Sequence, residues 1–180
     1  MRYTICTVAL LTTLTSATYA QESAKAEIGT ALGVTISIPD DGSTLTTFSV
    51  PGGSDFTGSP FLYATIFATP SVMVEPQINL TVLSGGGDTV WRTSLMGQLG
   101  YLFQPERTGS AYVAGHAGIL AAGNGSSESS QAVGAAVGYR QVLGGGAAVR
   151  FEARYRRWFG DIIRDVNEIT LGMAIGGVIR

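Results

Sequence analysis

The residues best suited to chemistry in this 180-residue chain are charged side chains that alternate along residues 147–159. Arg150, Glu152, Arg154 and Arg156 occupy every second position there. Side chains that recur with a period of two share one face of a β-strand. Arginine next to glutamate favours forked, charge-assisted hydrogen bonds. The pattern therefore indicates either a charged passage that prefers anions or a polar packing of paired side chains.

Enzymatic chemistry finds little support in the sequence. The only histidine, His116, shares its parity with Tyr112 and lies in no His-X-Ser pattern, so we expect a buried structural side chain and not a general base. Paired carboxylates, metal-ligand spacing and a phosphate-binding loop are missing, and Gly144–Gly146 reads as a hairpin turn. We expect no catalytic residue, no metal and no cofactor.

The first twenty residues predict a removable signal peptide. Arg2 precedes a mostly apolar run, residues 5–14, and Ala20 supplies the small residue at a cleavage site. The apolar run is shorter than the roughly 20 residues that a membrane helix needs. We therefore expect residues 1–20 to be the signal and 21–180 to be one barrel domain. The only cysteine, Cys6, lies in the signal, so no disulfide is expected afterwards.

Composition excludes several classes of protein. Without Arg2 the chain has 10 basic and 13 acidic residues, a net charge of −3, which is unlike a nucleic-acid-binding protein. Hydrophobic residues make up 45% of the chain, yet no segment after residue 20 is long and apolar enough for a membrane-spanning helix. The apolar residues are instead distributed through short alternating stretches.

Eight such stretches predict an all-β, antiparallel meander. They are residues 27–38, 61–68, 72–83, 91–103, 111–122, 131–142, 147–159 and 168–179. We interpret residues 45–50 as loop or as an extension of a neighbouring strand. Pro76 falls inside the third stretch, where proline predicts a bulge or a defect in the ladder.

The connections sort into two sets on opposite sides of the meander. Residues 69–71, 104–110 and 143–146 fall on the side of the termini, and 39–59, 84–88, 123–130 and 160–167 on the other. The second set is longer and more polar on average, as the outer loops of a bacterial outer-membrane barrel are. Asp40, Asp41, Asp55 and the Ser-rich residues 124–130 are its candidate contact surfaces.

A membrane barrel and a soluble, lipocalin-like barrel differ in which face of the wall contacts water. A soluble barrel needs a polar convex surface, yet Lys25 is the only lysine. We therefore expect Val149, Phe151, Ala153 and Tyr155 to face lipid.

Aromatic residues near strand ends are read as membrane-interface girdles. They are Trp91, Tyr101, Phe103, Tyr155, Trp158 and Phe159, with Arg157 beside them.

These features together resemble the small outer-membrane β-barrel family of OmpA/OmpX-like proteins. The resemblance covers residues 27–179 and includes Met73-Val74-Glu75-Pro76-Gln77 and Arg150-Phe151-Glu152-Ala153-Arg154-Tyr155. It implies an eight-stranded up-and-down transmembrane barrel in the bacterial outer membrane. The implied partners are membrane lipid, lipopolysaccharide and the barrel-assembly machinery. Such barrels usually end on an aromatic residue, whereas this chain ends on Ile179-Arg180.

An eight-stranded barrel is little wider inside than its side chains, so we expect its lumen to be plugged. Unpaired charges in such a lumen are costly, and we expect them to form ion pairs. The predicted network is Glu75, Arg92, His116, Arg140, Arg150, Glu152, Arg154 and Arg156. The predicted function is a non-enzymatic barrel with a structural role, or with surface recognition of a host or other ligand through its outer loops. The alternatives are a narrow anion-preferring porin and a soluble periplasmic binding barrel.

Overall fold

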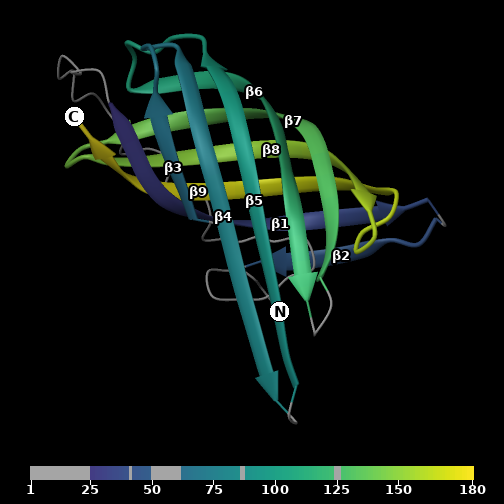
Figure 1. The fold of residues 1–180 in the computed structure, drawn as a ribbon. Helices are drawn as coiled ribbons and strands as arrows, with labels where there is room; N and C mark the ends of the chain where they lie inside the picture. Colours follow the sequence, from purple (N-terminus) through teal and green to yellow (C-terminus); the bar gives the residue numbers. More distant parts are fainter. Residues whose placement is uncertain (1–24, 41, 50–61, 86–87, 124–126) are drawn as a thin grey trace, which may run out of the picture.

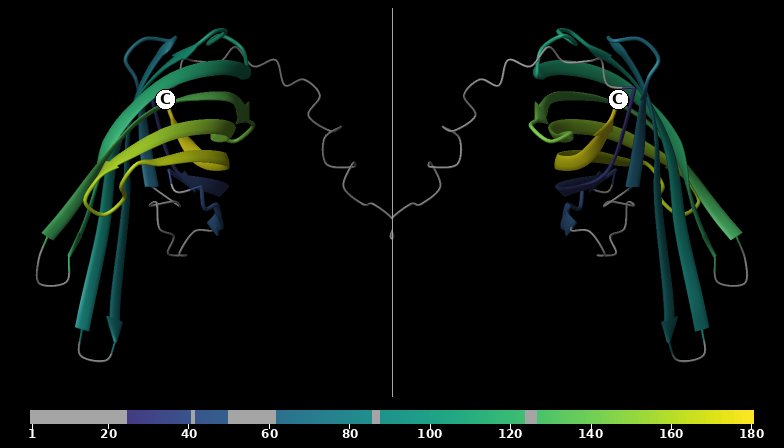
Figure 2. Two further views of the ribbon diagram at one scale, coloured as in Figure 1. Left: turned by 90° about the vertical axis from the view of Figure 1, so that its right-hand side faces the viewer. Right: turned by 90° about the vertical axis from the view of Figure 1, so that its left-hand side faces the viewer.

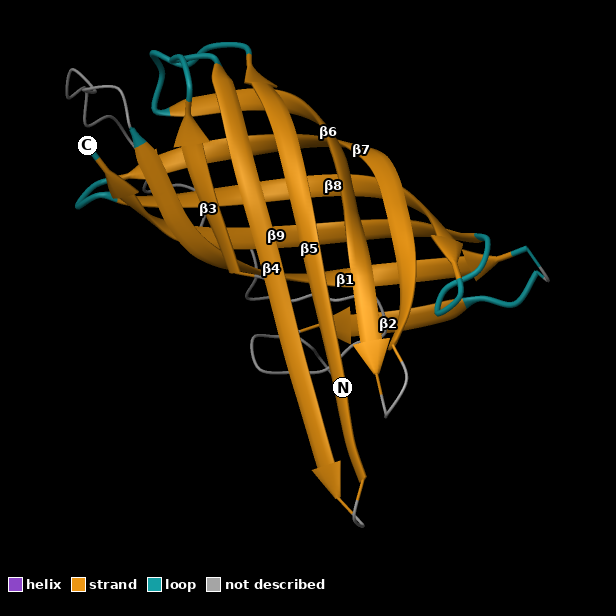
Figure 3. Ribbon diagram, in the orientation of Figure 1, coloured by secondary structure: helices purple, strands orange, loops and turns teal. Residues whose placement is uncertain are grey.

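The computed structural model describes residues 25–40, 42–49, 62–85, 88–123 and 127–180, and every regular element among them is a β-strand (Figures 1 and 3). The expected signal peptide, Cys6, Asp41, Asp55 and residues 124–126 lie outside the described residues. The strands are β1 (Ala26–Pro39), β2 (Leu45–Ser49), β3 (Leu62–Phe67), β4 (Val72–Gly85), β5 (Asp88–Leu102), β6 (Gly109–Gly123), β7 (Ser127–Leu143), β8 (Ala147–Gly160) and β9 (Val166–Ile179).

The strands form a closed antiparallel barrel. From β3 to β9 each strand pairs with the next, and β1 pairs with both β3 and β9, which closes the sheet. β2 and β3 pair with different parts of the same edge of β1, at Gly33–Ser37 and Ala26–Thr30, so together they take the place of one strand. The barrel thus has the eight strand positions that the sequence predicts. Residues 45–49, interpreted from the sequence as loop or as an extension of a neighbouring strand, form the separate short strand β2.

The register gives the tilt of the strands. Following the paired residues from Gln77 of β4 through β5, β6, β7, β8 and β9 arrives at Pro39 of β1. Following them from Gln77 in the other direction, through Tyr63 of β3, arrives at Gly29 of β1. One circuit therefore shifts the register by ten residues, from Pro39 to Gly29. A shift of this size in an eight-strand barrel corresponds to strands tilted by roughly 40° from the barrel axis.

Two details of the strands refine the predictions. The β3–β4 ladder lacks its pairs at Pro76 and Glu75, while the register is the same on both sides, so Pro76 causes a ladder defect and no bulge. β7 begins at Ser127, four residues before the predicted start, because Ser127–Ser130 pair with Leu120–Gly123. The predicted loop at residues 123–130 is shorter than expected for that reason.

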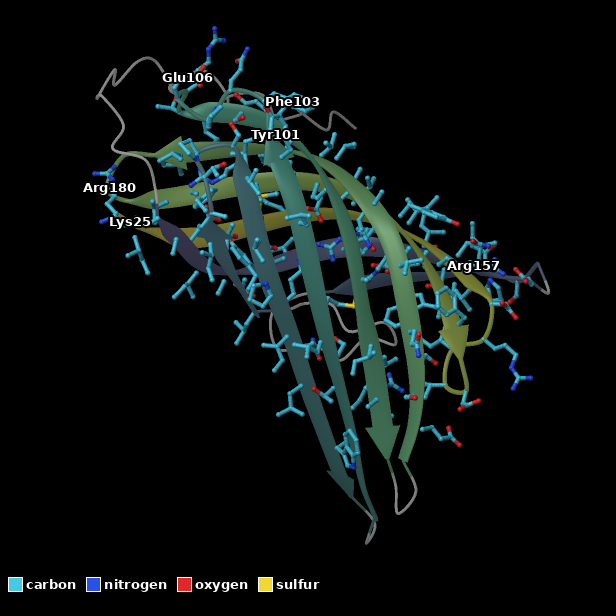
Figure 4. The ribbon with its side chains drawn as sticks, turned by 45° about the horizontal axis from the view of Figure 1, so that its top comes forward. Lys25, Tyr101, Phe103, Glu106, Arg157 and Arg180 are labelled. Carbon is cyan, nitrogen blue, oxygen red and sulfur yellow. The ribbon has the colours of Figure 1, made fainter. Side chains whose placement is uncertain are left out.

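The connections lie at two ends of the barrel (Figures 1 and 2). We call the end with Lys25, Arg180 and the turns after β3, β5 and β7 the terminal end, and the opposite end the loop end. The β4–β5 and β6–β7 hairpins extend farthest at the loop end. Lys25 and Arg180 lie close together at the terminal end, and Arg157 lies at the other (Figure 4).

The two faces of the wall differ sharply. Outward-pointing apolar side chains are exposed on every strand from β3 to β9 and on β1, with Leu80, Leu171 and Leu99 more than 60% exposed. The alternate positions point inward and are largely buried, as the burial patterns of β1, β6, β8 and β9 show. The described part of the chain has no helix able to span a membrane.

Inward-facing glycines make room for large side chains on the neighbouring strand. Tyr112 lies against Gly138, Met73 against Gly100, and Met96 against Gly118, in each case where a glycine Cβ would be. Large residues facing small ones fill a narrow interior without voids. The high glycine content, 25 residues in the whole chain, is thereby partly explained by the packing of the lumen.

A single added methyl group should distinguish the two faces. At Gly134 a Cβ would meet the backbone of Tyr155 and Arg156 and the ring of His116, whereas at Gly115, which points outward, it would meet nothing within 4 Å. We expect Gly134→Ala to lower the free energy of unfolding by about 1–3 kcal/mol. Gly115→Ala is the control and should leave urea unfolding unchanged. Equal effects of the two would contradict the assignment of faces.

Candidate functional site: the lumen of the barrel

Glu27 of β1 is fully buried and collects partners from two distant strands. Its carboxylate accepts hydrogen bonds from the Tyr63 hydroxyl at 2.7 Å and from Arg140 Nε at 2.8 Å. Arg150 Nε lies 3.5 Å from the same carboxylate, and its guanidinium lies over the Tyr63 ring at 4.1 Å. Glu27 therefore connects β1 to β3, β7 and β8 across the lumen.

Glu75 of β4 forms the next group. Arg150 Nη1 donates to its carboxylate at 2.6 Å, Gln77 Nε2 donates at 2.8 Å, and the Thr65 hydroxyl donates as well. Gln77 Nε2 also donates to Gln98 Oε1 at 3.0 Å, which extends the network to β5. Arg150 thus bridges Glu27 and Glu75.

Glu152 continues the network on the opposite wall. It accepts hydrogen bonds from the Tyr112 hydroxyl at 2.7 Å, from Gln98 Nε2 at 3.1 Å and from Arg154 Nε at 2.8 Å. Arg154 Nη1 donates to Gln77 Oε1 at 3.3 Å and so connects the groups around Glu75 and Glu152.

Glu168 of β9 occupies the loop end of the network. Arg156 donates to one carboxylate oxygen, from Nε at 2.7 Å and also from Nη2, and Trp158 Nε1 donates to the other at 3.1 Å. Thr170 donates to Glu168 at 3.3 Å and lies 3.1 Å from the Thr35 hydroxyl. The Glu168 carboxylate is fully buried and has a donor on each oxygen.

The network is balanced in charge. It contains four glutamates, Glu27, Glu75, Glu152 and Glu168, and four arginines, Arg140, Arg150, Arg154 and Arg156. The four arginines are at most 5% exposed. Within these eight residues the carboxylates and guanidiniums are equal in number, so this network carries no excess positive charge to attract anions.

Apolar clusters lie beyond the network at both ends. Near the terminal end Phe67, Met73, Leu102 and Tyr112 pack together, and near the loop end Trp158, Met96, Leu120 and Ile163 do so. Between them the network leaves a cavity of about 30 Å³ beside Gly33 and Gly172. A cavity of that size holds one or two water molecules.

The structure places the eight predicted network residues as follows. Glu75, Arg140, Arg150, Arg154 and Arg156 are buried, and Glu152 is half-buried, in the contacts given above. Arg92 is half-buried farther along β5, opposite Ala122. His116 is 6% exposed and lies against Gly134, and neither ring nitrogen has a hydrogen-bond partner among the described residues. No group of residues in the described ranges could hold a metal ion.

One prediction about the aromatic residues is wrong. Trp158 was expected at the outer membrane interface but is fully buried in the lumen, because it shares the parity of Arg154 and Arg156. Trp91, Tyr101, Phe103, Tyr155 and Phe159 are exposed on the outer face. The sequence interpretation also omitted Glu27 and Glu168. Each is a single charge on the inward parity near one end of its strand, and parity is the signal that identifies it.

The Arg156–Glu168 pair offers a test of the network. Removing one partner leaves a buried charge without compensation, so we expect Arg156→Gln to lower the free energy of unfolding by about 3–5 kcal/mol. Glu168→Gln added to it keeps an acceptor for Trp158 and should recover part of that loss. Arg157→Gln, at an exposed ion pair one residue along, is the control and should cost about 0–1 kcal/mol. A double variant no more stable than Arg156→Gln would argue against coupling.

Comparison with known proteins shows the fold. No family model matches the chain, and no curated protein matches it significantly. Neisserial surface protein A (NspA) superposes with a TM-score of 0.64 at 11% identity, over 87% of this chain and 99% of that one. Ail, the attachment invasion locus protein of Yersinia pestis, gives 0.51 at 10% identity over 88% and 100%. The chain has the fold of the small eight-stranded outer-membrane β-barrels.

Proposed function

We propose that the chain is an integral protein of the bacterial outer membrane, exported by the signal peptide expected at residues 1–20. The exposed apolar face supports this, because a soluble barrel would bury such residues. Trp91 and Tyr101 lie ten residues apart on the outer face of β5, near opposite ends of the strand. Ten residues span about 33 Å, or about 25 Å along the axis at a tilt of 40°, which fits the apolar band of such barrels.

Its lumen is a plug and not a passage. The observation that carries this proposal is the network of paired glutamates and arginines between two apolar clusters, beside a cavity that holds one or two waters. A barrel of this kind contributes structure to the membrane or recognition at its surface, without enzymatic activity. His116 has no serine or carboxylate hydrogen-bonded to it among the described residues, as a general base would require.

Recognition would fall to the loop end. Asp40, Glu128 and Asp161 are exposed there. Loops held on a rigid scaffold are where binding residues concentrate. Arg164 is exposed at the same end and Asp40 is paired with Arg157, so charges of both signs are available there to a ligand on a host or on another cell component. Membrane lipid, lipopolysaccharide and the barrel-assembly machinery are the other proposed partners.

A narrow porin is the second candidate, and conductance distinguishes it from a plug. We expect purified, detergent-folded protein to show no stable single-channel steps in a planar bilayer, because a lumen plugged by this network would leave no continuous opening for ions. Stable steps would overturn the plug. Anion selectivity of those steps would favour the porin that the arginines suggest.

The outward face can be tested by adding a charge. Phe151 is 54% exposed and central on the outer face of β8. We expect Phe151→Arg to make folding into lipid vesicles less favourable by about 2–4 kcal/mol, because a charge at mid-membrane is costly. Gln131→Arg, beside Phe159 near the loop end, is the control and should cost about 0–1 kcal/mol. Wild-type stability of Phe151→Arg, or recovery of the protein in the periplasmic fraction without detergent, would favour the soluble barrel.

A further inference from the structure

The connection between β8 and β9 folds back into the mouth of the barrel. Residues 161–165 follow β8, and Ile163 in their middle is only 5% exposed. Its side chain belongs to the apolar cluster of Trp158, Met96 and Leu120. Ile162 and Val166 pack against the same cluster. A surface loop that turns an aliphatic side chain inward covers the lumen at the loop end.

A single hydroxyl on the neighbouring strand β7 holds the backbone of this loop. Ser130 Oγ accepts hydrogen bonds from the backbone N–H groups of Ile162 at 3.0 Å and Ile163 at 2.8 Å. The Asp161 N–H donates to the Ser129 carbonyl at 2.9 Å. The backbone of the loop is therefore attached to the start of β7.

Both ends of the loop have unusual backbone conformations. Gly160 has a φ of 139°, and a Cβ there would meet Ser130 Cα at 2.6 Å, so only glycine allows the close approach. Asp165 has a φ of 53°, the only positive φ at a non-glycine among the described residues. Such a conformation is uncommon for residues other than glycine, although aspartate and asparagine adopt it more readily than most. The chain changes direction at these two points.

Arg157 connects this loop to the residue that follows β1 through exposed ion pairs. Its guanidinium donates to both carboxylate oxygens of Asp40, each at 3.1 Å, and to Asp165 at 3.2 Å. The side chains are 33%, 56% and 51% exposed for Arg157, Asp40 and Asp165. Figure 4 shows Arg157 at the edge of the loop end. Exposed ion pairs are screened by salt, unlike the buried pairs of the lumen.

We propose that residues 161–165 are a hinged lid on the lumen and that Arg157 is its salt-sensitive latch. When the latch holds, Ile163 keeps water from Trp158 and from the Arg156–Glu168 pair beneath it. When Asp40 and Asp165 release Arg157, the loop turns at Gly160 and Asp165. Water then reaches the apolar cluster of Trp158, Met96 and Leu120 at the loop end. The rest of the network, around Glu27, Glu75 and Glu152, stays closed, so opening hydrates the mouth without creating a channel.

The first test measures access to position 163 in the folded full chain. With Cys6 replaced by Ser, Ile163→Cys is labelled with a bulky maleimide, and Arg164→Cys, exposed one residue along, gives the reference rate. We expect labelling at 163 to be about tenfold slower or more, because it requires local opening. Raising salt from about 10 mM to about 1 M should speed it by about two- to fivefold, the factor that an exposed ion pair supplies.

Variants of the latch distinguish a specific effect of the Arg157 ion pairs from a general destabilisation of the loop. Arg157→Gln should speed labelling at low salt and abolish the salt dependence. Asp165→Asn, which keeps a residue tolerant of positive φ, should act in the same direction. Glu128→Gln, an exposed acid at the same end outside the latch, is the matched control and should change nothing. A heat-modifiable gel shift shows that each variant is folded. Equal labelling of 163 and 164 would refute the lid, and unchanged salt dependence in Arg157→Gln would refute the latch.

A second measurement leaves Ile163 intact. In Trp91→Phe the remaining tryptophan is Trp158, which is fully buried. Acrylamide should quench its fluorescence weakly in the parent and more strongly after Arg157→Gln or in high salt. Strong quenching in the parent at low salt, or no change after Arg157→Gln, would overturn the proposal. Planar-bilayer recordings of Arg157→Gln should stay silent, because the lid and the plug are separate barriers.

Discussion

The glutamates and arginines inside the barrel depend on one another for their hydrogen bonds and ion pairs. Each has been removed from bulk water, and each recovers that loss only through partners on other strands. Glu27 reaches β3, β7 and β8, and Glu75 reaches β8. A shift of one strand by one residue would turn these side chains outward and leave their partners unpaired. The network therefore specifies the register of the wall as well as filling the lumen.

The apolar clusters at the two ends make this dependence stronger. Met73 and Leu102 near the terminal end, and Trp158 and Ile163 near the loop end, limit the access of water to the charges between them. A lower local dielectric strengthens each ion pair and raises the cost of a missing partner. The inward glycines serve the same packing, because Tyr112 and Met73 fit only where Gly138 and Gly100 leave space.

Strand parity accounts for most of what could be predicted. It assigned Arg150 and Phe151 to opposite faces correctly, because a period of two is unambiguous over a long strand. Trp158 was misplaced because its aromatic character was weighed above its parity. The start of β7 was missed because Ser127–Ser130 have loop-like composition, and pairing with β6 overrides that preference. Contacts such as Arg140–Glu27 depend on strands far apart in the sequence, so no local pattern could reveal them.

The pairing of β1 with β9 has a consequence for the order in which the barrel forms. All 14 residues of β1 pair with β9, across almost the whole length of the described chain. The other ladders from β3 to β9 join strands that are adjacent in sequence and can form locally as hairpins. Joining the ends requires closing the longest loop, which is the slowest kind of contact. Since Glu27 lies on β1, Arg140 and Arg150 can contact it only after β1 has paired with β9. Closure of the wall and completion of the charge network therefore become one cooperative event.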